Sequence, residues 1–342
     1  MAMALYEPGL GYYTNALQKF GTMPTSGSDF VTAPGISPLF GQTLAAQVQE
    51  ALQATGTDEV WEFGAGTGAL ALQLLQSLGD AVKRYTIIDL SGSLRARQAE
   101  TLLKYAGKVR WLDTWPEAIE GVVVGNEVLD AMPVHLLQRT QGVWHERGVV
   151  SASENAESEG KGFAWQDRIT DLRPPVEIEG AHDYLTEIHP QAEAFVASLA
   201  ERLLAGRGGA AFFLDYGFPE AEYFHPQRHM GTVMCHQLHQ ADDNPLVAVG
   251  QKDITAHVNF TGVALAAQNA GLNVLGYTSQ AWFLLNLGLA ERMANASLAE
   301  RSQAQRLVNE HEMGELFKVI GFSTSADVSA QGFARGDRSH RL

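Results

Sequence analysis

Cysteine is almost absent from this sequence of 342 residues, in which Cys235 is the only thiol. A single thiol forms no disulfide within the chain, so we expect a reducing compartment. Long apolar runs are also missing, because the longest, residues 281–290, is interrupted by Asn286 and is too short to cross a bilayer. The first 13 residues contain no basic stretch followed by an apolar one. We therefore expect a cytoplasmic protein with no membrane span.

Positive charge is the second scarcity. The chain has 24 Lys and Arg against 39 Asp and Glu, a formal net charge of −15. Such a surface repels polyanions, so nucleic acid is not an expected partner, whereas a basic protein is compatible with it. Apolar residues make up 45% of the chain, which is enough for a core. The length predicts one large α/β domain with insertions or two domains that share a boundary.

Short apolar segments alternate with helical patterns between residues 60 and 125. The helical stripe Leu70, Leu74, Leu75 and Leu78 follows the first segment, and a second helix is expected over residues 94–105. This alternation predicts a parallel sheet that is covered on both faces, the α/β class. The expected strands are 60–63, 84–89, 109–112 and 121–125, with a fifth at 210–214 and a closing strand at 316–322.

The rest of the chain is less regular. We expect a hairpin of residues 135–140 and 143–150, a loop over 151–162, and an irregular insertion over 218–250. Further helices are expected over 37–52, 187–204, 253–271 and 280–296, and a frayed tail from residue 334. The predicted division is an N-terminal segment (1–55), a core (56–134 and 187–217), an inserted hairpin and loop (135–186), a substrate-side insertion (218–312), and a closing strand and tail (313–342).

A glycine-rich turn follows the first strand, in the segment EFGAGTG (62–68). Gly64, Gly66 and Gly68 let the backbone turn sharply and approach a ligand at a helix N-terminus. The same pattern fits a dinucleotide site, so the glycines alone do not choose the cofactor. Glu62 favours S-adenosylmethionine, because a carboxylate at the end of a buried strand needs a cationic partner such as an amino-acid ammonium. The alternative is that Glu62 caps a loop or pairs with a structural arginine.

Two acidic residues end the next strands. Asp89 is 23 residues after Gly66, where a carboxylate accepts hydrogen bonds from both ribose hydroxyls, a requirement that NAD and S-adenosylmethionine share. Asp113 ends the third strand and is a candidate acceptor for an adenine amino group. The alternative, which stays equally open, is that Asp113 is an ordinary surface residue.

The segment after the fourth strand carries the candidate acceptor site. Glu127 and Asp130 are three residues apart, so on a helical turn both project to one side and are able to hold a guanidinium or an amine. The alternative is that they are only caps at the end of a strand. Asp215 and His135 are weaker candidates for taking a proton.

Histidines cluster between residues 225 and 257, close to Cys235. Their spacing matches no standard zinc site, and strand alternation places Cys235 and His236 on opposite faces. We therefore predict no metal site, and expect these histidines to line the acceptor groove or to satisfy hydrogen bonds in loops.

These motifs, taken with others, resemble the MidA-like family of class I S-adenosylmethionine-dependent methyltransferases. The segments that carry the resemblance are YEPGLGYY (6–13), DFVTAPGISPLFG (29–41), EFGAGTG (62–68), GNEVLDAMPVH (125–135), LDYG (214–217), DITAHV (253–258) and MGELFK (313–318). They span nearly the whole chain, and such an ordered set is far more specific than one glycine turn.

The resemblance implies a class I methyltransferase core, S-adenosylmethionine as cofactor, and further cofactor contacts. Those contacts are Thr32, Ser37, Ala65, Thr67, Leu90 and Asn126. The family includes a mitochondrial member that symmetrically dimethylates an arginine of a respiratory complex I subunit, so a protein-arginine substrate is expected. Two rival functions stay open: a nicotinamide-dependent oxidoreductase that uses the same turn, and an assembly factor that binds S-adenosylmethionine without catalysis.

Overall fold

A central mixed sheet organises the fold in a computed structural model, which describes residues 1–15, 19, 31–89, 91–152 and 162–342. The strand order is β14-β15-β9-β4-β1-β2-β3, and β13 pairs with β9. β15 is antiparallel to both of its neighbours, whereas β3, β2, β1, β4 and β9 are parallel. The strands are β1 (Glu59–Phe63), β2 (Arg84–Ile88), β3 (Val109–Leu112), β4 (Gly121–Asn126), β9 (Gly209–Phe218), β13 (Val258–Asn259), β14 (Asn273–Ser279) and β15 (Phe317–Ser323).

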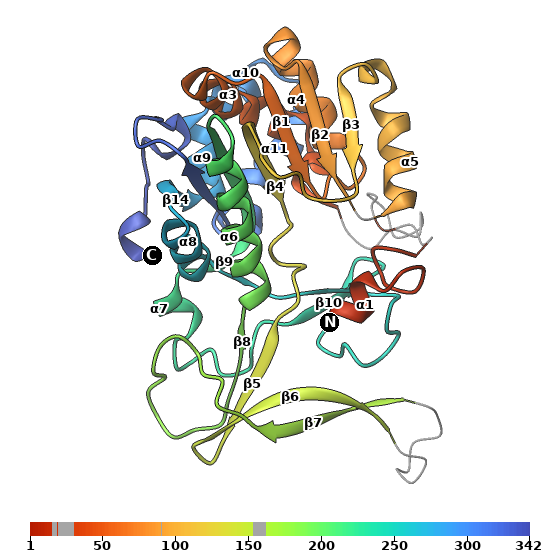
Figure 1. The fold of residues 1–342 in the computed structure, drawn as a ribbon, viewed down its shortest axis with the longest axis vertical. Helices are drawn as coiled ribbons and strands as arrows, with labels where there is room; N and C mark the ends of the chain where they lie inside the picture. Colours follow the sequence, from red (N-terminus) through yellow and green to blue (C-terminus); the bar gives the residue numbers. More distant parts are fainter. Residues whose placement is uncertain (16–18, 20–30, 90, 153–161) are drawn as a thin grey trace.

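Helices cover both faces of this sheet (Figure 1). One apolar cluster joins β1, β4 and β9 to α3 (Pro38–Thr55), α4 (Ala69–Leu78), α9 (Gln280–Asn286), α10 (Leu289–Asn295) and α11 (Leu298–Val308). A second cluster joins the opposite face to α6 (Pro190–Ala205) and α8 (Phe260–Asn269). The remaining α-helices are α1 (Ala2–Tyr6), α2 (Ala33–Ile36), α5 (Gly92–Thr101) and α7 (Glu220–Tyr223). No helix within the described ranges is long and apolar enough to cross a membrane.

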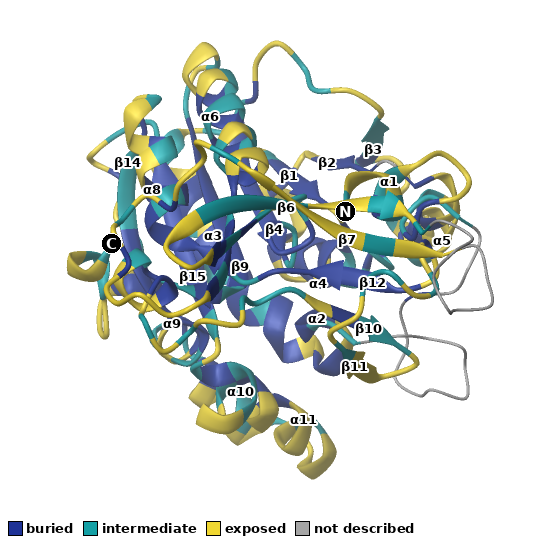
Figure 2. Ribbon diagram, turned by 90° about the horizontal axis from the view of Figure 1, so that it is seen from below, coloured by how far each residue is buried: buried dark blue, intermediate teal, exposed yellow. Residues whose placement is uncertain are grey.

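Two smaller antiparallel sheets extend from this body. One has the order β7-β6-β5-β8, built from β5 (His135–Thr140), β6 (Val143–Ser151), β7 (Phe163–Ile169) and β8 (Tyr184–Ile188). The other has the order β11-β10-β12, built from β10 (Met234–Gln237), β11 (Gln240–Asp242) and β12 (Asp253–Thr255). Figure 2 shows the contrast between the buried central strands and the largely exposed ribbon of β6 and β7.

Two helices expected in the first half of the chain are formed, and both begin behind a serine cap. Ser37 caps α3 by accepting a hydrogen bond from the backbone N–H of Leu39, and Ser91 caps α5 in the same way through Leu94. The expected hairpin is formed, because Gln141 and Gly142 both adopt positive φ, the conformation of a tight two-residue hairpin turn. It belongs to a four-stranded sheet, whose strands β7 and β8 the sequence did not indicate. The expected loop over 151–162 lies mostly outside the described residues.

Two predicted helices begin later than expected. The pattern over 187–204 starts as strand β8, and helix α6 begins only at Pro190, where proline fits the first turn. Residues 253–259 are extended in β12 and β13, so the helix predicted over 253–271 was wrong in its first part. α8 begins at Phe260 behind the cap Asn259. Residues 218–250, expected to be irregular, contain α7, β10 and β11.

The C-terminal part of the chain is more ordered than predicted. The helix expected over 280–296 is two helices, because Gly288 adopts a left-handed conformation between them. β14 was not expected, and it lies with α8 in the range that the predicted division assigned to an insertion. The frayed tail was wrong, since the backbone N–H of Arg338 donates to Tyr277 and its guanidinium pairs with Glu315.

We predict that Phe333→Ala destabilises the protein by about 3–5 kcal/mol, because it empties a site in the apolar core. Phe333 is buried against Phe283 with ring centroids 5.2 Å apart. Urea unfolding measures the loss, and Leu298→Ala is the control, since Leu298 is 84% exposed. Equal stability of the two variants would contradict the packing of Phe333 in the core.

Candidate functional site

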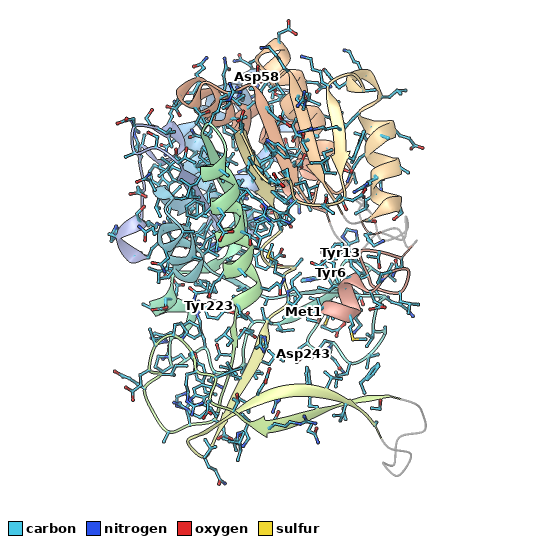
Figure 3. The ribbon with its side chains drawn as sticks, viewed as in Figure 1. Met1, Tyr6, Tyr13, Asp58, Tyr223 and Asp243 are labelled. Carbon is cyan, nitrogen blue, oxygen red and sulfur yellow. The ribbon has the colours of Figure 1, made fainter. Side chains whose placement is uncertain are left out.

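A cavity of about 740 Å³ lies at the carboxyl ends of the parallel strands β1, β2 and β4. Figure 3 shows Asp58, which precedes β1, at the opposite edge of the sheet from this cavity. The cavity also receives side chains from the N-terminal segment, from β10 and from β12. Open α/β sheets bind ligands at this edge. Its volume is within the range of small-molecule and cofactor sites, roughly 300–1,000 Å³.

The glycine turn forms one wall of the cavity. Gly64, Gly66 and Gly68 have φ angles of 63°, 51° and 80°, which strain any residue with a Cβ. Helix α5 fixes the turn from behind: the Gln98 side-chain amide donates to the carbonyl of Gly66, and the Thr101 hydroxyl donates to that of Thr67. Backbone atoms of residues 64–67 therefore face the cavity in one fixed shape.

Glu62 lies at the end of β1 and is 3% exposed. Its carboxyl accepts a hydrogen bond of 2.6 Å from the Tyr85 hydroxyl. Burial raises the pKa of Glu62 to about 8, since no basic side chain of the described residues is positioned to offset the lost hydration. The arginine partner considered as an alternative is therefore not present among the described residues.

The two other acidic strand ends differ in burial. Asp89 is buried and accepts hydrogen bonds from the Ser91 backbone N–H (2.9 Å) and the Gln98 amide (2.7 Å). Burial raises the pKa of Asp89. Asp113 lines the cavity with a largely exposed side chain that pairs with Arg95 at 2.6 Å. Asp89 is thus fixed in orientation, whereas Asp113 stays accessible.

Asn126, Glu127 and Asp130 follow β4 and line the cavity together. Glu127 has a φ of 55°, an uncommon conformation for a residue with a side chain. Its carboxylate accepts a hydrogen bond of 2.9 Å from the Asn126 amide, and burial, followed by the nearby Asp130, raises its pKa to about 8. Asp130 accepts a hydrogen bond of 2.5 Å from the Tyr216 hydroxyl, and burial raises its pKa to about 6.

Asp215 is buried beneath this turn and is not among the residues that line the cavity. One carboxylate oxygen accepts hydrogen bonds from the backbone N–H groups of Val128, Leu129 and Asp130, at 3.1, 2.9 and 3.2 Å. The other oxygen accepts a hydrogen bond of 2.9 Å from the backbone N–H of Tyr216. Asp215 therefore holds the turn that presents Glu127 and Asp130, a role different from the proton acceptor considered from the sequence.

Three other predicted site residues lie outside the cavity. Ser37 is buried as the cap of α3, and Gly68 turns away from the cavity toward α5. His135 is on β5, where its ring pairs with Glu146 at 2.6 Å. Leu90 lies outside the described residues. Thr32, by contrast, lines the cavity together with Ala65 and Thr67.

Several cavity residues were missed by the sequence reasoning. They are Tyr6, Tyr13, Tyr216, Asp253 and Thr255. The helix wrongly expected over 253–271 concealed the last two, because strand β12 places residues 253 and 255 on one face. Tyr6 and Tyr13 stack with ring centroids 5.7 Å apart, and Figure 3 shows them together on the N-terminal segment.

The histidine-rich segment divides between the cavity and other surroundings. His236 and His257 line the cavity, while Cys235 points the other way and packs with Leu5 and Ile254, as strand alternation predicted. Over the ranges that the structure describes, no three His, Cys, Asp or Glu side chains are grouped as they would be around a metal ion.

The charged side chains that line the cavity are all acidic among the described residues. Six carboxyl side chains line it, and within the described residues no lysine or arginine does. The six are Glu62, Asp89, Asp113, Glu127, Asp130 and Asp253. Buried carboxylates without a basic partner are stabilised by a positively charged ligand.

Comparison with known proteins agrees with this geometry. Residues 43–278 match the family described as "Putative S-adenosyl-L-methionine-dependent methyltransferase". The chain belongs to this family. S-Adenosylmethionine is accordingly the cofactor of the methyltransferase, and the mixed α/β sheet is that of the class I methyltransferases, as the sequence predicted.

Both a solved structure and curated sequence relatives match this methyltransferase over nearly its whole length. A protein from Burkholderia thailandensis, described as a "likely methyl transferase" bound to S-adenosyl-homocysteine, is 48% identical, with a TM-score of 0.91 over 100% of this chain and 90% of that one. Protein arginine methyltransferases NDUFAF7 of mitochondria are more distant. The Danio rerio protein is 28% identical over 96% of this chain and 83% of its own, and the Homo sapiens protein 28% over 100% and 82%.

We predict that Asp215→Ala destabilises the methyltransferase by about 2–3 kcal/mol or more, because buried N–H groups of the turn lose their acceptor. Asp215→Asn keeps an acceptor oxygen and should cost less. Denaturant unfolding measures both variants, with Asp167→Asn on β7 as an exposed control. Wild-type stability of Asp215→Ala would show that the turn does not depend on this carboxylate.

Proposed function

We propose that this methyltransferase transfers the methyl group of S-adenosylmethionine to a guanidinium nitrogen of an arginine in a protein partner. The observation that carries the proposal is the pair of carboxyls of Glu127, which is half-buried, and Asp130, which is buried; both share the cavity with the glycine turn. Two convergent acceptors match the planar set of N–H donors of a guanidinium. The names of the NDUFAF7 relatives support arginine as the acceptor.

The donor half of the cavity fits S-adenosylmethionine. Glu62 receives its ammonium group, Asp89 accepts from the ribose hydroxyls, and Asp113 accepts from the adenine amino group. The backbone of residues 64–67, with Thr32 and Asn126, completes this half. Glu62 supports the assignment most strongly, because its burial without a basic partner is relieved by a cation.

When bound, S-adenosylmethionine supplies a methyl group on a sulfonium, whose sulfur keeps the bonding electron pair and leaves as a neutral thioether. Glu127 and Asp130 orient the guanidinium so that a nitrogen lone pair forms the new C–N bond. That nitrogen gives up one proton, which Glu127 accepts in its carboxylate form. The methylated guanidinium therefore keeps a single positive charge. Tyr216 holds Asp130 in place during this exchange.

The protein partner is identified here only by its arginine. A net charge of −15 is consistent with a basic segment around that arginine. Symmetric dimethylation and a complex I subunit as partner, both expected from the family resemblance, stay predictions.

We predict that Gly66→Val abolishes binding of S-adenosylmethionine, since a β-branched residue does not adopt the φ of 51° at this turn. Gly79→Val is a matched control, because Gly79 has a φ of 53° and open space around it. It carries similar backbone strain and should bind normally. Calorimetry with S-adenosylmethionine and NAD measures both variants. Undiminished binding by Gly66→Val, or tighter binding of NAD by the wild type, contradicts the donor site.

Glu127→Gln should lower methyl transfer by roughly 10²-fold or more, because it removes the proton acceptor and keeps the shape. Affinity for S-adenosylmethionine should stay within a few-fold of wild type, and Asp130→Asn should act less severely. Transfer of labelled methyl into arginine of an extract from cells that lack the protein is the assay, with Glu146→Gln, half-buried on β6 and outside the cavity, as the control. Label recovered on lysine or on a small molecule refutes the arginine acceptor.

A further inference from the structure

The segment DITAHV (253–258) contributes to the cavity a row of polar side chains that the proposed reaction has not used. Asp253 and Thr255 lie in β12, and His257 follows it. All three line the cavity, whereas the intervening residues Ile254 and Ala256 do not. Extended backbone explains this period of two. The row therefore forms a third wall of the cavity. It comes from a segment that is distant in sequence from both the glycine turn and residues 126–130.

Hydrogen-bond acceptors in this row and beside it have no partner among the described residues. Among the described residues, seven buried side-chain polar atoms make no hydrogen bond, and four of them belong to residues that line the cavity. The four are Asn126 Oδ1, Asp130 Oδ1, Thr255 Oγ1 and His257 Nδ1. Thr255 and Asp130 are only 3% and 5% exposed. Unpaired acceptors at such depth are costly, so their concentration in one cavity points to a ligand that donates several hydrogen bonds.

Aromatic side chains hold these groups in place. The Tyr13 hydroxyl donates to Asp253 at 2.9 Å, and the Tyr216 hydroxyl donates to Asp130 at 2.5 Å. The His257 ring stacks on Phe218, with centroids 5.2 Å apart and planes within 4°, and meets the Tyr216 ring edge-on at 5.2 Å. Burial lowers the pKa of His257 to about 4, so its ring is neutral near pH 7 and one ring nitrogen is free to accept.

We propose that Asp253, Thr255 and His257 form, beside Asp130, the subsite that recognises the acceptor as a guanidinium. This inference rests on the proposed function and assigns substrate specificity within it. The ligand must be cationic, because Asp253 and Asp130 are acidic, and it must donate hydrogen bonds in several directions, because the unpaired acceptors come from separate chain segments. A guanidinium has five N–H donors in one plane, whereas an ammonium has three donors on a single atom.

Thr255→Val separates recognition from folding. Thr255 Oγ1 lies beside Tyr216 but is unsatisfied among the described residues, so the isosteric change keeps the shape of the site and should change the melting temperature little. The probe is the capped tripeptide acetyl-Gly-Arg-Gly-amide, added to the full chain saturated with S-adenosylhomocysteine and followed by NMR titration. Thr255→Val and His257→Phe should each weaken peptide binding about fivefold. Asp253→Asn should weaken it about tenfold or more, because a charged acceptor is lost.

Controls and related peptides define the alternatives. Thr140→Val and Asp167→Asn, in β5 and β7, should bind the peptide as the wild type does. The citrulline peptide, a neutral analogue of the arginine peptide, should bind at least about tenfold more weakly. Equal binding of the arginine, lysine and citrulline peptides, or wild-type binding by both Thr255→Val and His257→Phe, overturns the subsite.

The same experiment keeps the subsite and the proposed function apart. Replacing S-adenosylhomocysteine by S-adenosylmethionine turns the titration into an assay of methyl transfer to the peptide. If the variants weaken binding as expected and no methylarginine forms in the wild type, the subsite stands and the proposed function fails. If methylarginine forms equally in the wild type and in all three variants, the function stands and the subsite is refuted.

Discussion

The burial of carboxyl groups without basic partners is the constraint on which the rest of this structure depends. At the edge of the sheet Glu62 and Asp130 are buried and Glu127 is half-buried, and no lysine or arginine among the described residues enters the cavity to replace the lost hydration. Their raised pKa values express that cost. A cavity of this kind is completed by cations, and the proposed reaction brings two, the donor and the guanidinium.

Hydrogen bonds to backbone groups, rather than opposite charges, hold these carboxyl groups in position. Gln98 and Thr101 on α5 fix the glycine turn, and Asp215 collects the N–H groups of the turn that follows β4. Parallel strands bring these turns to one edge. The N-terminal segment then closes the site, since Tyr6 donates to the carbonyl of Ala131 and Tyr13 donates to Asp253. Donor and acceptor chemistry thus share walls that are positioned independently of the ligands.

The sequence predicted the parts of the site that depend on local pattern. Strands β1 to β4 are short apolar runs with turn residues between them, and Glu62 and Asp89 could be placed because each ends such a run. The predictions were wrong where pairing with a distant strand, and not the local spacing of apolar residues, decides the secondary structure. Residues 253–259 have a helical pattern of apolar positions, yet β12 and β13 are extended because β10 and β9 offer them hydrogen-bonding edges. The roles of Asp215 and Tyr13 depend on contacts across 85 and 240 residues, which spacing in the sequence does not reveal.

Proton release on binding of S-adenosylmethionine tests the central claim most directly. In the free protein the pKa of Glu62 is about 8, so at pH 6.5 its carboxyl is protonated. An ammonium beside it lowers that pKa and expels the proton, so affinity should rise as the pH increases toward 8. Calorimetry at pH 6.5 in buffers of different ionisation enthalpy should show about one proton released per ligand bound, and less for Glu62→Gln. No release by the wild type, or equal release by the variant, contradicts the account.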